Sequence, residues 1–64
     1  MTPEDRVILL AAVNILREQS HYFGDRQDDA GVNELLASCA YEACDELAYY
    51  LDKLDEYAGM LERA

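Results

Sequence analysis

The side chains able to do chemistry in this 64-residue sequence are mostly carboxylates, and the most suggestive pair is Glu42 and Asp45. Their three-residue spacing places both carboxylates on one face of a helix, where such a pair is half of a divalent-metal site. Histidine occurs once, as His21, with no nucleophile or second ligand beside it, so we expect it to cap a helix or pack on the surface. The sequence has no glycine-rich phosphate-binding loop.

The run of residues 42–51, EACDELAYYL, resembles one helix of the all-α nucleotide pyrophosphohydrolases. In that family a magnesium site also needs an E-x-x-E pair on the preceding helix. The matching part of this sequence offers only Glu18, so the resemblance implies at most half of such a site. We therefore expect no metal site, no cofactor and no catalytic residue, and we do not expect the chain to be an enzyme.

The two cysteines, Cys39 and Cys44, have neither C-x-x-C nor zinc-site spacing. On a helix they would lie about 140° apart, so we expect two reduced, mostly packed thiols rather than a disulfide within the helix. No basic leader opens the sequence, and its longest apolar run, from Val7 to Val13, is far shorter than the roughly 20 residues of a membrane span. We expect a cytoplasmic protein that does not interact with membranes.

Fourteen acidic residues against five basic ones give a formal net charge of −9, which argues against direct binding of nucleic acid. The acids and one aromatic form a stripe at helical spacing, which we expect to be exposed and to bind a partner: Glu42, Asp45, Tyr49, Asp52 and Glu56, with Glu46 beside them. On one straight helix these carboxylates would give about one charge per 4 Å, close to the ~3.4 Å of a DNA strand. The stripe is thus either a solubilising face or a protein-docking face, and mimicry of nucleic acid is one form that such docking could take.

The sequence predicts a small acidic, oligomeric protein-interaction module. It would dock the stripe, with Tyr49 as anchor, on a basic nucleic-acid-binding surface of a protein partner and inhibit or modulate it. By analogy, small acidic proteins of this kind are often inhibitors encoded by phages or mobile elements. Two alternatives stay open. One is an oligomer that sequesters a small molecule or nucleotide, with Arg6, Arg17, Arg26 and Lys53 among the contacts; the other is a structural subunit of a hetero-complex.

The elements that would position these residues are two helices. Thr2 as N-cap and Pro3 at the first helical position predict a helix over about residues 3–23, followed by a polar loop over residues 24–31. Asp29 or Asn33 would cap a second helix over about residues 32–63. We expect an all-α antiparallel hairpin forming one domain over residues 1–64.

Apolar residues on the second helix repeat every three or four positions from Leu36 to Leu61, as in a heptad seam. In a hairpin the longer helix would overhang by roughly 18 Å beyond Leu51, and the first helix is apolar nearly all round. Apolar surface of this extent predicts self-association into a helical bundle, so we expect a homodimer or a larger oligomer. The expected interface residues are Val7, Leu10, Leu47, Tyr50, Leu54, Tyr57 and Leu61.

Overall fold

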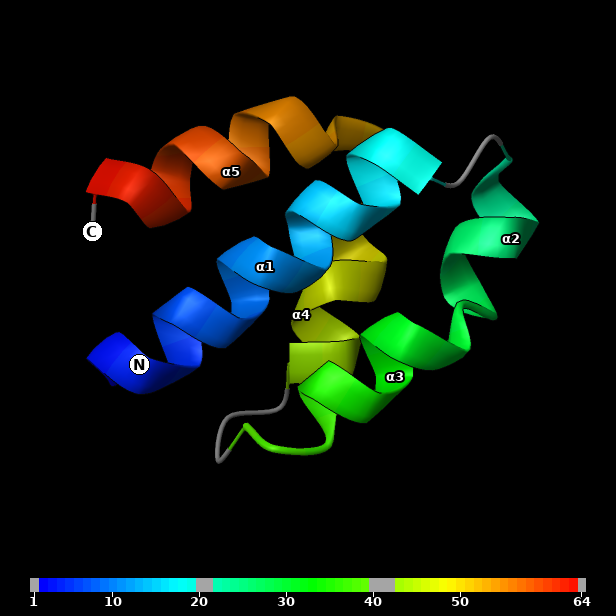
Figure 1. Ribbon diagram of the computed structural model, residues 1–64. Coiled ribbons are helices and arrows are strands. Elements are labelled where there is room, and N and C mark those ends of the chain that lie inside the picture. Colours follow the sequence, from blue (N-terminus) through cyan, green and yellow to red (C-terminus); the bar gives the residue numbers. More distant parts are fainter. Residues whose placement is uncertain (1, 20–21, 40–42, 64) are drawn as a thin grey trace.

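The computed structural model (Figure 1) describes residues 2–19, 22–39 and 43–63, without the side chain of residue 23. Within these ranges every regular element is helical, which confirms the all-α class. The elements in chain order are α1 (Pro3–Gln19), α2 (Phe23–Gln27), α3 (Ala30–Leu36), α4 (Ala43–Tyr49), the 3-10 turn η1 (Leu51–Lys53) and α5 (Leu54–Arg63). None of the described helices is long and apolar enough to cross a membrane.

Helix α1 begins as its sequence predicts and buries a single face. The Thr2 hydroxyl accepts a hydrogen bond from the Asp5 backbone N–H at 3.1 Å, and Pro3 occupies the first helical position. The single chain does not cover every apolar side of α1: Val7, which we expect at an interface between copies, is 63% exposed. The buried apolar face repeats every three or four residues and consists of Leu9, Ala12, Val13 and Leu16.

The predicted long helix over residues 32–63 is wrong: that part of the chain is divided into α3, α4, η1 and α5. A straight helix of that length would extend about 48 Å, whereas the 17 residues of α1 span only about 26 Å. The longest dimension of the molecule is 29 Å. Folding back lets both halves of the segment pack against α1, and this burial outweighs the helical propensity of the unbroken sequence. The chain is therefore not a two-helix hairpin.

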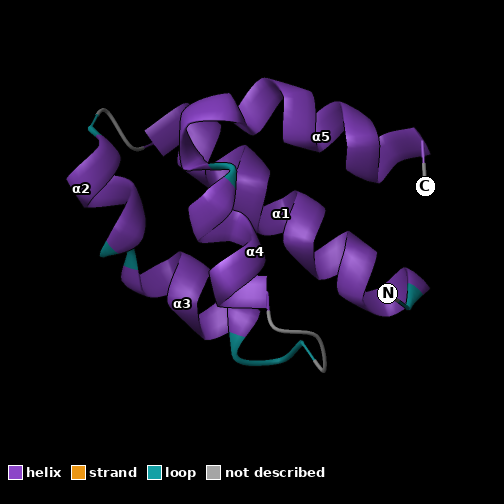
Figure 2. Cartoon of the chain, turned by 180° about the vertical axis from the view of Figure 1, so that it is seen from behind, coloured by secondary structure: helices purple, strands orange, loops and turns teal. Residues whose placement is uncertain are grey.

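Helix α1 lies in the middle of the molecule and contacts α3, α4 and α5. Both views show α5 alongside α1, with the two ends of the chain on the same side, while α4 crosses α1 steeply (Figures 1 and 2). Side chains of α1 reach α5 near both of its ends. Arg6 Nη1 donates to the Leu61 carbonyl at 3.4 Å, and Arg17 Nε lies 2.7 Å from Asp55 Oδ1. These contacts define an antiparallel pair.

Every described seam position except Tyr50 is buried, even though the helix predicted to carry them is broken. Leu54, Tyr57 and Leu61, which we expected to need a partner molecule, are 5%, 1% and 2% exposed in the single chain. The radius of gyration, 10.5 Å, is close to the ~10.7 Å expected of a globular domain of this length. The overhang that motivated self-association is thus absent, because α1 covers these side chains. Self-association stays a prediction, without that support.

The remaining seam and interface positions fall into two groups. Leu36, Ala43 and Leu47 are buried in the same core, whereas Leu10 and Tyr50 are half-buried at its edge. The seam residue Ala40 lies outside the described residues. Of the expected interface, therefore, only Val7 presents a mostly open side chain.

Candidate functional site

The acidic stripe expected on one helix is divided by the turn at η1. Because the chain changes direction between α4 and α5 (Figure 1), the stripe residues do not follow one straight axis. The regular charge spacing compared above with a DNA strand is therefore absent, and the mimicry of nucleic acid loses its geometric basis. The structure places Asp45, Glu46 and Tyr49 on α4, Asp52 on η1 and Glu56 on α5, while Glu42 lies outside the described residues.

The α4 part of the stripe stays together as one surface. Asp45 and Tyr49 are four residues apart on the helix, so they are neighbours on one face, and both are exposed. Glu46, next to Asp45, is half-buried. We call Asp45, Glu46 and Tyr49 the α4 acidic face. It presents carboxylates beside Tyr49, a residue that is 78% exposed.

The exposed ring of Tyr49 is one end of a row of three tyrosines. It packs edge-on against the ring of Tyr50, with centroids 5.0 Å apart and an interplanar angle of 83°. The Tyr50 ring in turn stacks on that of Tyr57, at 4.4 Å and 6°. Tyr57 is a core residue, 1% exposed. This row, which we call the tyrosine row, thus connects a solvent-facing ring to the interior through one stacked and one edge-on contact.

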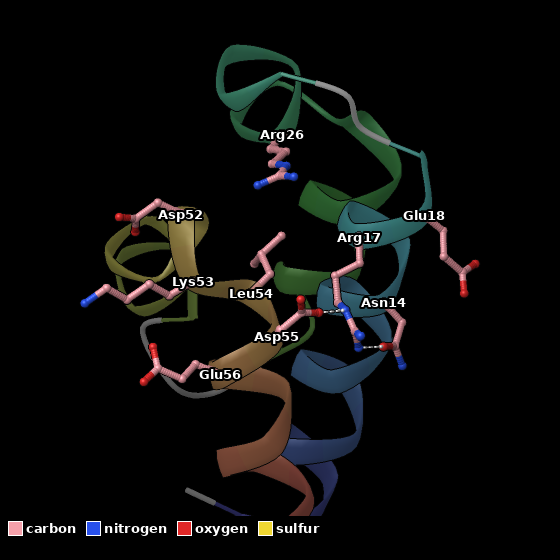
Figure 3. Close-up of a pocket in the computed structure, with 9 residues that line it drawn as sticks. All are labelled: Asn14, Arg17, Glu18, Arg26, Asp52, Lys53, Leu54, Asp55 and Glu56. Carbon is pink, nitrogen blue, oxygen red and sulfur yellow. Dashed lines mark hydrogen bonds and ion pairs between the residues drawn. The ribbon is translucent and has the colours of Figure 1, made fainter.

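A separate feature is an open hollow of about 670 Å³ between the C-terminal half of α1, α2 and the η1–α5 segment (Figure 3). Three of the five lysines and arginines of the chain line it, namely Arg17, Arg26 and Lys53. These belong to the cations that the sequence suggested for a small-molecule site, and here they meet within one chain. The other lining residues are Asn14, Glu18, Asp52, Leu54, Asp55 and Glu56.

Arg26, on α2, is the best-fixed cation of the hollow. Its Nη1 donates to the Leu51 carbonyl at 2.8 Å, and this bond satisfies a backbone oxygen at the turn between α4 and α5. Its Nε is buried, and no hydrogen-bond acceptor reaches it within the described residues. The same side chain also borders a second, smaller hollow of about 160 Å³ that contains Leu36, Cys44 and Leu47 in its lining. Sequence reasoning missed this role because α2 lies in a stretch that reads as a polar loop.

Arg17 and Asp55 form the other charged contact at the hollow. Besides its 2.7 Å contact with Asp55, Arg17 donates through Nη1 to Asn14 Oδ1 at 3.3 Å. The Asp55 side chain is 86% exposed and that of Arg17 is 40% exposed. Ion pairs this open to water contribute little to stability, so the pair exchanges readily with other partners.

The two thiols differ from the expectation that both are mostly packed. Cys44 is exposed on α4, whereas Cys39 is half-buried after α3. Burial raises the pKa of Cys39 above the ordinary value of 9.0, and the nearby charges of Asp5 and Cys44 raise it further. Within residues 2–19, 22–39 and 43–63 no group of three or more potential ligands is placed to hold a metal ion. His21 lies outside the described part of the chain.

Comparison of the chain with protein-family models, with curated proteins and with solved structures finds no match. A functional conclusion therefore depends on the chemistry of the two surfaces above.

Proposed function

We propose that this chain is a protein-interaction module that docks the α4 acidic face on a basic surface of another protein. The observation that carries the proposal is the tyrosine row, which holds the exposed ring of Tyr49 against Tyr50 and, through it, against the core residue Tyr57. A ring held in place before binding loses little conformational entropy on docking, and tyrosine is enriched among the residues that dominate binding energies.

The negative charge of the chain favours a partner with a basic surface. The chain carries a net charge of −9, and the exposed Asp45 carboxylate lies one helical turn from the Tyr49 ring. A partner with positive potential is therefore attracted over a distance set by the ionic strength, and its lysines or arginines meet carboxylates around the aromatic anchor. A nucleic-acid-binding surface has this chemistry, and docking there blocks or modulates the partner.

The test uses capture of partners from the cell that makes the protein, with matched variants as bait. Tyr49→Ala removes the anchor, while Tyr22→Ala removes a tyrosine that is similarly exposed, at 74%, but lies just before α2. We expect a basic protein to be retained by the unchanged chain and by Tyr22→Ala. We expect Tyr49→Ala to lose it, and about 0.5 M NaCl to release it, because salt screens exposed charges.

Two results would contradict the proposal. Equal retention by Tyr49→Ala and Tyr22→Ala baits would show that the α4 acidic face is not the contact. Capture that is unchanged at high salt, or that recovers only acidic proteins, would show that charge does not select the partner. Circular dichroism of both variants checks that each bait is folded.

A further inference from the structure

We infer that Cys39 and Cys44 form a reversible disulfide within one chain, which makes the connection between α3 and α4 a redox-sensitive cross-link. Both thiols are free in the structure. The oxidant is a small-molecule disulfide such as oxidised glutathione, which exchanges with protein thiols. The inference concerns the connection between two helices and does not depend on the proposed function.

The end of α3 removes the geometric objection to this bond. On one continuous helix Cys39 and Cys44 would point about 140° apart, so their side chains could not meet. In the structure α3 ends at Leu36, and the Cys39 backbone N–H donates to the Leu36 carbonyl at 3.1 Å. A hydrogen bond to the third residue back is typical of a tight turn. Cys44 belongs to the next helix, α4, so the two thiols lie on either side of a change in chain direction.

Packing of α3 against α4 brings the two sides of this connection together. The two helices contact each other, and both views show them next to each other (Figures 1 and 2). Leu36 at the end of α3 and Ala43 at the start of α4 belong to one core cluster, and Cys39 packs against it. Cys44 directly follows Ala43 in the sequence. Each cysteine is thus within three residues of a side chain that joins the two helices.

The difference in exposure gives the two thiols different steps. Cys44 is exposed and lines the smaller hollow of about 160 Å³, so a small disulfide can reach its sulfur. Cys39 is half-buried, and its pKa is raised by burial and further by the charges of Asp5 and Cys44. A thiol that keeps its proton is a poor first nucleophile. Cys44 therefore reacts first, and Cys39 completes the bond.

The exchange takes two steps. The Cys44 thiolate attacks one sulfur of oxidised glutathione, so that a mixed disulfide forms, the glutathione S–S bond breaks and one glutathione thiolate leaves. The Cys39 thiolate then attacks Cys44 Sγ, which forms the Cys39–Cys44 bond and releases the second glutathione thiolate. The two leaving thiolates take up the protons that the cysteines lost. Together the protein thiols lose two electrons, and the glutathione disulfide gains them.

Folding and the disulfide should favour each other. A fold that holds the two thiols on packed helices raises the effective concentration of one at the other above its value in the unfolded chain. By linkage, the factor by which folding favours the bond equals the factor by which the bond favours folding. The unfolded chain has the same four residues between its cysteines, so it is the control for closeness in the sequence alone.

The experiment incubates the intact chain with mixtures of reduced and oxidised glutathione, stops the exchange with acid and measures the products by mass spectrometry. We expect the main product of the folded chain to be two hydrogen atoms lighter than the reduced chain, with no glutathione attached and no covalent dimer. We expect the disulfide to be at least about tenfold more stable in the folded chain than in the same chain in urea. The oxidised chain should also melt at a higher temperature than the reduced chain.

Two variants test the order of the steps. Cys39→Ser should stop at a glutathione adduct of Cys44, whereas Cys44→Ser should form its adduct on Cys39 at least about tenfold more slowly. Circular dichroism checks that each variant is folded, and the comparison with urea needs no variant. A disulfide equally stable in the folded and unfolded chain would overturn the inference. The same holds if the unchanged chain ends as a glutathione adduct or a covalent dimer, or if both variants react at the same rate.

Discussion

Tyr49 and Tyr57 are the two ends of one row of aromatic rings, yet their surroundings are opposite. Tyr57, on α5, is 1% exposed and packs among the apolar residues that α5 buries against α1. Tyr49, at the end of α4, is 78% exposed, and its helix buries only Ala43 and Leu47. The turn at η1 separates Tyr49 from Tyr57. The same apolar spacing therefore gives a core helix, α5, after the turn and a helix with an exposed aromatic face, α4, before it.

This difference shows how stability and binding are divided in a very small protein. Chains of about 60 residues bury too little surface to spare large side chains for other purposes. Here α5 contributes to the core nearly every apolar residue it has, whereas α4 keeps one aromatic ring in solvent. Tyr49 is therefore the large side chain that α4 leaves open to contact with another molecule.

Removing Tyr57, the buried end of the tyrosine row, should have the largest effect on the free energy of unfolding. Tyr57→Ala takes a core side chain away from α1 and from Tyr50, and we expect it to lower the free energy of unfolding by about 3–5 kcal/mol. Urea denaturation followed by circular dichroism measures this change. Tyr49→Ala is the matched control and should stay within about 0.5 kcal/mol. Similar losses for both variants would end the contrast between the two regions.

Removing Tyr50, the middle of the tyrosine row, should have an intermediate effect on the free energy of unfolding. Tyr50 is half-buried and touches both neighbours, so Tyr50→Ala loses two aromatic contacts and part of the core edge. We expect a loss of about 1–3 kcal/mol in the same denaturation experiment. Because Tyr49 then loses its support, its fluorescence anisotropy should fall as the ring moves more freely, provided that the other tyrosines are replaced by phenylalanine. An unchanged anisotropy would show that the row does not fix Tyr49.

The smallest expected effect concerns Cys39 and Cys44, which also differ in how far their side chains are exposed. Cys44 is exposed and Cys39 is half-buried with a raised pKa, so iodoacetamide at pH 8 should modify Cys44 first. The folded Cys39 thiol keeps its proton to higher pH than an unfolded thiol. The stabilisation it gives is therefore complete below its ordinary pKa of 9.0 and declines as the pH rises above it. Mass spectrometry of modified peptides measures the order, and faster modification of Cys39 would contradict it.

Some of this fold follows from local residue chemistry. The start of α1 depends on Thr2 and Pro3, and the start of α3 on Asp29, whose side chain accepts from the Val32 backbone N–H at 2.9 Å. These are contacts between residues close in the chain, so spacing alone predicts them. The apolar spacing also predicted the burial of Leu47 and Leu61, because which side chains turn inward depends on local periodicity.

The breaks after Leu36 and Tyr49 could not be predicted in this way. No glycine or proline occurs between residues 32 and 58, and what favours the turns is the packing of three segments around α1. Likewise α2 occupies a stretch with the composition of a loop, and Gly24, the first residue of the predicted loop, lies inside this helix. Tertiary burial outweighs propensity in both places.

The same distinction applies to the candidate sites: features of a single helix could be predicted from the sequence, whereas contacts between distant elements could not. Exposure of Asp45 and Tyr49 was predictable from their shared helical face. The hollow was not, because it joins Arg17, Arg26 and Asp55 from three elements that are far apart in the chain. The stacking of Tyr50 on Tyr57 also depends on the turn at η1, which the sequence does not signal.

The 3-10 turn at Leu51–Lys53 has one more consequence. The apolar residues keep the same three- or four-residue spacing before and after this turn. Straightening residues 51–53 would therefore separate α5 from α1 as a C-terminal arm whose apolar face is unchanged. The α1 of a second molecule would accept that arm through the same contacts that its own α5 makes. Exchange of C-terminal arms between two copies would then cost little beyond opening the turn, and it would yield an intertwined pair with no interface absent from the single chain.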